Sequence, residues 1–120
     1  MASGNIVNTE YYNTGDTIRF GGSNTMFAGR VGWAGKEIWF TIPLTKKVND
    51  VSDISCTVGS GDIYACTYNN AVNLKNLNYS IIATARDSII SVRMIFDTAP
   101  LDITDGAANI MINTSFVFTF

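Results

Sequence analysis

The chain has 120 residues, the length of one domain with a single sizeable core. Its formal net charge is −2 and its eight basic residues are scattered, so we expect no surface for nucleic acid. Charged residues make up only 15% of the chain and apolar residues 47%, which favours a homo-oligomer whose subunits cover part of each other's surface. The alternative is a monomer with a neutral surface of Asn, Thr and Ser.

The first sixteen residues carry no sustained strand or helix pattern. We interpret 1–16 as a lead-in or attachment arm and 17–120 as a single β-sandwich domain. The start of the chain lacks the basic region and apolar segment of a signal peptide, and no run of about 18 apolar residues is present. We therefore expect neither export nor insertion into a membrane.

Alternation of apolar and polar residues then recurs along the chain, and no segment carries a helix-like stripe. Short candidate strands occupy 17–20 and 25–33. The clearest early strand runs from Glu37 to Leu44, where every second residue is apolar and Trp39 points to the opposite face. Pro43 lacks an N–H donor, which places it at an edge, a strand end or a bulge.

Segments 52–58 and 63–68 flank the turn residues Gly59 to Asp62 and are predicted to form a hairpin. Cys56 and Cys66 lie on its two arms. If the turn is centred on its third residue, the two thiols lie opposite each other and could form a disulfide. If the loop comprises all four turn residues, they do not meet. Since we expect no export, we favour two free thiols that pack as small apolar groups.

Segments 77–85 and 89–96 form a second predicted hairpin, and its register can be derived. With Asp87 and Ser88 as a two-residue loop, the side chains on one face are all apolar or aromatic. The expected pairs on this face are Ala85 with Ile90, Ala83 with Val92, Ile81 with Met94, and Tyr79 with Phe96. The opposite face pairs Thr84 with Ser91 and Ile82 with Arg93.

The last predicted strand runs from Ala108 to Phe120 and ends in three alternating phenylalanines. Because chain ends usually fray, this pattern predicts that the terminal strand lies inside a sheet or at a subunit contact. About seven or eight strands and no long helix are expected. The predicted fold class is all-β: an antiparallel two-sheet β-sandwich that is jelly-roll-like.

Few residues suit catalysis or metal binding. The chain has no histidine, which excludes Ser-His-Asp and Cys-His catalysis and imidazole metal ligands. Two cysteines cannot form a thiolate zinc site alone, and most acidic residues fall at predicted turns. We expect no enzyme, no catalytic residue, no metal and no cofactor. A small glycan hydrolase, which needs two carboxylates across a cleft, is the least favoured alternative.

Aromatic side chains are the remaining candidates for ligand binding or for an interface. The candidates are Trp33, Trp39, Tyr64 and Tyr68, with Tyr11 and Tyr12 as further residues that can reach the surface. An exposed ring beside Asn and Asp can hold a sugar, with the ring against C–H groups and the amides on hydroxyls. The alternative, which we favour, is that Trp39 packs against another chain or the N-terminal arm.

Three segments, taken in order, carry a family resemblance: EIWFTIPLTKKV (37–48), LNYSIIATARDSIISVRMIF (77–96) and TSFVFTF (114–120). With the glycine-turned hairpin between the first two, this order resembles the C-terminal β-sandwich domains of tailed-bacteriophage structural proteins of the tail-fibre and virion appendage type. It covers about 37–120 as a pattern of strands, and no family binding residue can be matched position by position. The long fibrous repeat expected upstream is missing.

The resemblance implies a non-enzymatic virion structural protein, assembled in the bacterial cytoplasm. We expect a tail-fibre, spike or receptor-binding appendage domain that forms a homo-oligomer, with a trimer favoured. Its expected partners are other virion proteins and a host-surface glycan. The alternatives are a capsid decoration or head-fibre protein with a purely structural role, and a free-standing carbohydrate-binding module.

Overall fold

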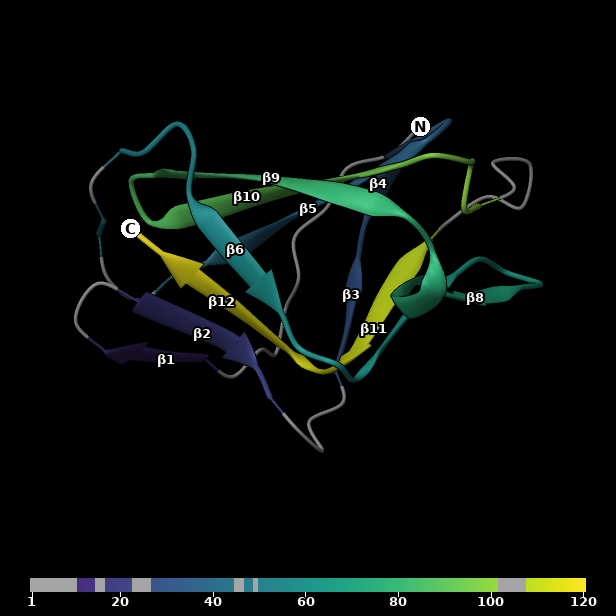
Figure 1. The fold of residues 1–120 in the computed structure, drawn as a ribbon, viewed down its shortest axis with the longest axis horizontal. Helices are drawn as coiled ribbons and strands as arrows, with labels where there is room; N and C mark the ends of the chain where they lie inside the picture. Colours follow the sequence, from purple (N-terminus) through teal and green to yellow (C-terminus); the bar gives the residue numbers. More distant parts are fainter. Residues whose placement is uncertain (1–10, 15–16, 23–26, 45–46, 49, 102–107) are drawn as a thin grey trace.

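A computed structural model describes residues 11–14, 17–22, 27–44, 47–48, 50–101 and 108–120. These residues form twelve β-strands and one short 3-10 helix, η1 (Leu74–Asn76). The strands make three four-stranded sheets, and every pairing in them is antiparallel (Figure 1). The predicted all-β, antiparallel, sandwich-like fold is confirmed. Within the described segments, no helix approaches the length and apolar character that crossing a bilayer requires.

Each sheet combines strands from distant parts of the chain. Sheet A has the order β4 (Gly32–Ala34), β5 (Glu37–Pro43), β10 (Ile89–Phe96) and β9 (Tyr79–Arg86). Sheet B has the order β1 (Tyr11–Thr14), β2 (Thr17–Gly21), β12 (Ser115–Thr119) and β6 (Ser55–Val58). Sheet C has the order β3 (Phe27–Arg30), β11 (Asn109–Asn113), β7 (Asp62–Cys66) and β8 (Ala71–Asn73).

The hairpin of β9 and β10 has the register that its alternation predicts. Ala83 lies opposite Val92 and Tyr79 opposite Phe96, and these side chains face the interior. Asp87, the first of the two loop residues, has φ +59°, a conformation that Asp tolerates better than most residues. A one-residue slip would turn the whole apolar face toward solvent, which is why the pattern determines this pairing.

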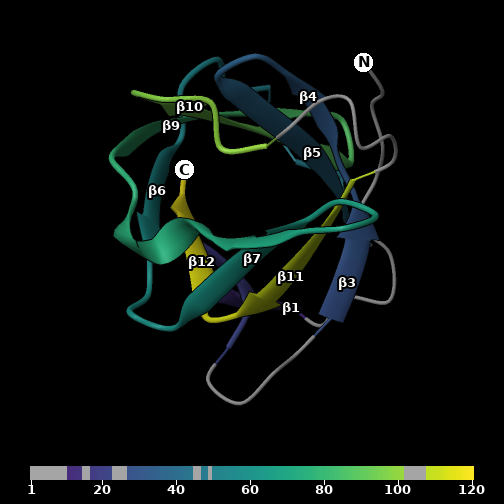
Figure 2. The same cartoon turned by 90° about the vertical axis from the view of Figure 1, so that its right-hand side faces the viewer.

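Sheets B and C are two halves of one bent layer. The chain passes between them at three neighbouring places: from β2 to β3, from β6 to β7, and from β11 to β12. Because these strands keep the same neighbours on both sides, the layer is continuous apart from a corner. Sheet A forms the other layer, so the three sheets still make a two-layer sandwich (Figure 2).

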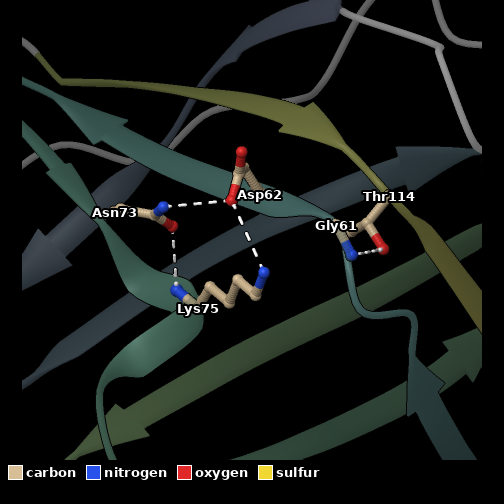
Figure 3. Close-up of polar contacts among 5 residues, drawn as sticks. All are labelled: Gly61, Asp62, Asn73, Lys75 and Thr114. Atoms are coloured by element: carbon tan, nitrogen blue, oxygen red, sulfur yellow. Dashed lines mark hydrogen bonds and ion pairs between the residues drawn. The ribbon is translucent and has the colours of Figure 1, made fainter.

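Thr114 lies at the corner of this layer and is buried. Its carbonyl accepts the N–H of Gly22 at 2.9 Å, and its hydroxyl accepts the N–H of Gly61 at 3.2 Å (Figure 3). A Cβ on Gly61 would collide with the backbone carbonyl oxygen of Asn113, and one on Gly59 would lie 2.5 Å from the Thr114 hydroxyl oxygen. Glycine is therefore required where the two chain segments cross most closely.

The corner corrects two predictions. β6 and β7 lie in different sheets and do not form a hairpin with each other, and the predicted last strand divides into β11 and β12. Burial alternates without interruption through Ile112, Thr114 and Phe116, so the pattern carries no sign of the bend. The structure also has more strands than the seven or eight predicted. Four of them, β1, β3, β4 and β8, have only three or four residues, too few to show a clear alternation of apolar and polar side chains.

The N-terminal prediction also changes in part. Tyr11–Thr14 was assigned to the lead-in, yet it forms β1 and pairs with β2. Residues 1–10 and 15–16 of that predicted arm lie outside the described residues.

The core fills the space between the layers. Phe40 of sheet A and Phe116 of β12 are fully buried, with ring centroids 5.9 Å apart. Phe118 lies 6.3 Å from Phe116, also by ring centroids, and is equally buried. Since β12 lies between β2 and β6, the aromatic end of the chain is inside a sheet, as predicted, and only Phe120 is partly exposed.

A further segment, 50–54, covers the outer edge of β9. Val51 and Ala85 exchange two backbone hydrogen bonds of 2.9 Å, and the Ile54 N–H donates to the Ala83 carbonyl at 2.8 Å. These bonds satisfy backbone groups that would otherwise offer a template for another strand. This part of the β9 edge is therefore not free to pair with a strand of another chain.

Candidate functional site

The four aromatic candidates do not come together in one site. Trp33 is only 4% exposed and belongs to the core, so its ring is not part of a surface. Trp39 is half-buried on the outer face of sheet A, whereas Tyr64 is half-buried on the outer face of sheet C, in the opposite layer. Tyr68 is 86% exposed in the turn between β7 and β8. The two outer faces must be considered separately.

Trp33 is buried, contrary to the prediction that it can reach a ligand or an interface, because it lies on the inward-facing side of β4. It lies opposite Ile38, a fully buried residue of β5, and therefore shares the inner face of sheet A. Its indole nitrogen is buried and has no hydrogen-bond partner among the described residues. Tyr11 and Tyr12 lie in β1, opposite Phe20 and Arg19.

Trp39 faces outward because β5 alternates strictly. Ile38, Phe40 and Ile42 point into the core and are fully buried, which leaves Trp39 and Thr41 on the other side. The outward position of Trp39 was predicted from this alternation. Its neighbours were not, because they belong to strands distant in sequence.

Those neighbours are given by the registers within sheet A. Trp39 lies opposite Arg93 of β10, and Arg93 lies opposite Ile82 of β9. On its other side Trp39 lies opposite Gly32 of β4, which contributes no side chain. The Arg93 guanidinium Nη2 donates to Glu37 Oε1 at 2.7 Å, and Glu37 lies two residues before Trp39 on the same face of β5.

A shallow hollow of about 350 Å³ lies on this face. The residues that line it are Glu37, Trp39, Phe40, Thr41, Ser91, Val92 and Arg93. The small side chains of Thr41 and Ser91, which lie opposite each other, form its floor beside the larger indole and guanidinium. Trp and Arg together around a depression are the residue types that dominate the energetics of protein interfaces.

Apolar side chains surround the hollow. Ile82 is 38% exposed and Ile89 is 42% exposed, and both belong to the outer face of sheet A. Pro43 lies directly opposite Ile89 and is also exposed. Among the described residues, this face therefore combines several large apolar groups with two guanidiniums: Arg93, which pairs with Glu37, and the exposed Arg86, which lies opposite Ile89. Arginine beside large apolar side chains is typical of protein interfaces.

The outer face of sheet C differs in chemistry. Tyr64 lies opposite Asn73 on one side and Met111 on the other, and Asp62 precedes it by two residues on the same face. Asn73 Nδ2 donates to Asp62 Oδ1 at 3.1 Å, and Lys75 Nζ lies 4.0 Å from that oxygen (Figure 3). The side-chain oxygen of Asn73 accepts the backbone N–H of Lys75 at 3.1 Å. The Asn73 side-chain amide is therefore hydrogen-bonded through both its nitrogen and its oxygen, and it lies beside Tyr64.

Both cysteines are free thiols, as favoured from the sequence. Cys56 is in sheet B and Cys66 in sheet C, because the hairpin that would have joined them does not form. Burial raises the pKa of the Cys56 thiol to about 12, and burial also raises the pKa of Cys66. Both thiols are therefore protonated at neutral pH and are weak nucleophiles.

In the part of the chain that the structure describes, no group of three His, Cys, Asp or Glu side chains is placed to hold a metal ion. Comparison of the chain with protein-family models, with curated proteins and with solved structures finds no match in any of the three. The class that the fold and the two faces define is an all-β sandwich domain in which one outer face carries Trp39, Ile82 and Ile89 and the other carries Tyr64 beside polar groups.

Proposed function

We propose that this chain is a non-enzymatic structural protein of a bacteriophage virion, a tail-fibre or receptor-binding appendage domain that self-associates. The outer face of sheet A is the single observation that supports self-association best. It carries Trp39, Ile82 and Ile89 around a hollow, on a chain with only 15% charged residues. The virion assignment rests on the resemblance of 37–120 to phage appendage domains.

Burial of this face accounts for the apolar composition. Each large aliphatic side chain moved from water into an interface contributes about 1.5–3 kcal/mol when fully covered. Ile82 and Ile89 are already partly covered by their own sheet, so each adds a fraction of that amount. Trp39 contributes a large rigid area at small cost in conformational entropy.

Light scattering on the purified chain tests self-association directly. The proposal expects a mass that is a multiple of 13.1 kDa and that falls on dilution. A mass of one chain at all concentrations would contradict it and would favour the free-standing carbohydrate-binding module.

Location in the particle separates the appendage from the structural alternative. An antibody against the chain should label the tail in electron micrographs of particles from the bacterium that expresses it. Label on the capsid would instead support a decoration or head-fibre protein. Particles without label would contradict a virion role altogether.

Glycan contact is a second proposed function, supported by the Tyr64 face. The ring has the Asn73 amide on one side, with Asp62 on the same face, and these are polar groups suited to hydroxyls; the apolar Met111 lies on its other side. An array of bacterial-surface polysaccharides should therefore bind the wild-type chain but not Tyr64→Ala. Tyr64→Phe retains the stacking ring and should bind measurably. Equal binding by all three chains would remove Tyr64 from the site.

A further inference from the structure

The row of residues that crosses sheet A at Trp39 can face a copy of itself. Trp39 and Arg93 are direct partners on neighbouring strands, so they lie side by side at the same level of the face. The same row continues to Ile82 at one end and to Gly32 at the other. Its order is therefore glycine, tryptophan, arginine and isoleucine from β4 to β9.

We propose that the occupant of this face is a second copy of the chain, related by a two-fold axis that runs parallel to the strands between β5 and β10. This inference rests on the self-association proposed above and specifies its geometry. Such an axis places β5 of one copy over β10 of the other. Each residue of β5 then lies over the residue of the partner's β10 that corresponds to its own cross-strand neighbour. Trp39 of each copy then lies over Arg93 of the partner subunit, and the contact occurs twice.

The chemistry of these two contacts is complementary. A guanidinium stacked on an indole face is the favoured arrangement of a cation and an aromatic ring. Arg93 is already hydrogen-bonded to Glu37 at 2.7 Å, so Glu37 balances its charge within one copy, and the stack needs less further ordering of the guanidinium.

The axis also sets the ends of the row against each other. It brings the exposed Ile82 to β4 of the partner subunit at the level of Gly32, a residue without a side chain that its own chain already buries. Two rows further along, beyond Thr41 and Ser91, Pro43 and Ile89 form the last row of the face. The usual rotation of about 30° between packed sheets moves this outer row out of register, so the matching is limited to the central rows.

The size of the face is consistent with a reversible dimer. The strands of the face have three, seven, eight and eight residues, each covering about 3.3 Å by 4.8 Å, which gives roughly 400 Å² per copy. The two copies together bury about 800 Å², the size of a weak, reversible interface. A face that packs against its own counterpart closes with two copies, so the proposal differs from the trimer expected from the family resemblance.

Sedimentation velocity on the full chain tests the geometry, over concentrations from about 1 μM to about 1 mM. The expected result is a monomer–dimer equilibrium. Trp39→Ala and Arg93→Ala should each weaken the dimer about tenfold or more. Tyr68→Ala, a change to an exposed aromatic residue outside the face, is the matched control and should leave the dimer unchanged.

Mixing the two variants gives the decisive measurement. Neither variant alone can form a Trp39–Arg93 contact. A mixed dimer keeps one, between Trp39 of the Arg93→Ala chain and Arg93 of the Trp39→Ala chain. An equimolar mixture should therefore associate more tightly than either variant alone. Circular dichroism establishes that both variants are folded, and Ile82→Glu, at an exposed position, provides a third variant that should also weaken the dimer.

The outcomes separate the inference from the function on which it rests. A trimer, a dimer unaffected by all three substitutions, or a mixture no tighter than its components would overturn the two-fold geometry and leave self-association standing. A monomer at every concentration would overturn both.

Discussion

The N–H of Gly61 donates a hydrogen bond to the hydroxyl of Thr114, 53 residues further along the chain, at the corner of the bent layer. The bond joins the β6–β7 connection to the β11–β12 connection, and so it links two neighbouring chain segments where both change sheet. Neither residue carries chemistry for ligand binding. Their contact instead ties the two segments together at the corner between sheets B and C.

Gly61→Ala should destabilise the fold strongly. The added Cβ collides with the backbone carbonyl oxygen of Asn113, and backbone cannot move aside as a flexible side chain can. We expect the free energy of unfolding, measured with urea, to fall by about 2 kcal/mol or more. Gly35→Ala is the control, because a Cβ at this position meets no atom within 4 Å. The only expected cost is that of an alanine at φ +56°, about 1 kcal/mol of unfolding free energy. Equal losses from the two variants would show that the corner is not sterically tight.

Thr114→Val should test the hydrogen bond at the same place. Valine keeps the shape of threonine but leaves the Gly61 N–H without its acceptor, so we expect a loss of about 1–3 kcal/mol. Thr114→Ser retains the hydroxyl and should lose less. Thr57→Val, on an exposed position of β6, should change the free energy of unfolding by less than about 0.5 kcal/mol. A harmless Thr114→Val would mean that water or another group replaces the acceptor.

Phe116→Ala should reveal how the layers are held together. Its ring lies 6.1 Å from that of Phe20, 5.9 Å from that of Phe40 and 6.3 Å from that of Phe118, measured between centroids. Truncation removes contacts to both layers and should cost about 3–5 kcal/mol in thermal or urea unfolding. Phe120→Ala, at a residue 37% exposed, should cost less than about 1 kcal/mol. Comparable losses would contradict a core centred on β12.

Stability should fall in alkaline solution because of Cys56. Its thiol pKa is about 12 in the folded chain and 9.0 in the absence of burial, so between these values the unfolded chain binds fewer protons. The free energy of unfolding therefore decreases as pH rises through this window and is insensitive to Cys56 below it. Burial, and then the charge of Cys56, raise the pKa of Tyr79, which adds to the same trend.

Urea unfolding at about pH 8 and about pH 10.5 measures this dependence. Cys56→Val removes the titrating thiol and should make the decrease shallower. Cys66→Val removes the thiol in sheet C, whose pKa burial also raises, and so measures how much of the decrease belongs to the second cysteine. Parallel pH profiles for the wild type and Cys56→Val would show that another group dominates alkaline unfolding.

The candidate site was predictable only in part. Alternation in β5 is local, and it placed Trp39 on the outer face without any knowledge of other strands. Arg93 and Glu37 come together because β5 pairs with β10, across 56 residues of sequence. That pairing depends on packing between distant segments, and no local pattern specifies it. The position of Trp33 was predicted wrongly for a different, local reason. β4 has only three residues, too few for alternation to show which face points inward.

The amino-acid sequence by itself determined the all-β class, the register of β9 with β10 and the inward face of each long strand. In these cases a period of two over seven or eight residues leaves one arrangement that buries the apolar groups. Only the tertiary structure decided that Gly59 to Asp62 joins two sheets rather than two hairpin arms, and that the terminal strand breaks at Thr114. Glycines suit a hairpin turn and a corner equally well, because both need only a backbone without a Cβ. Which of the two forms depends on where the other strands leave room.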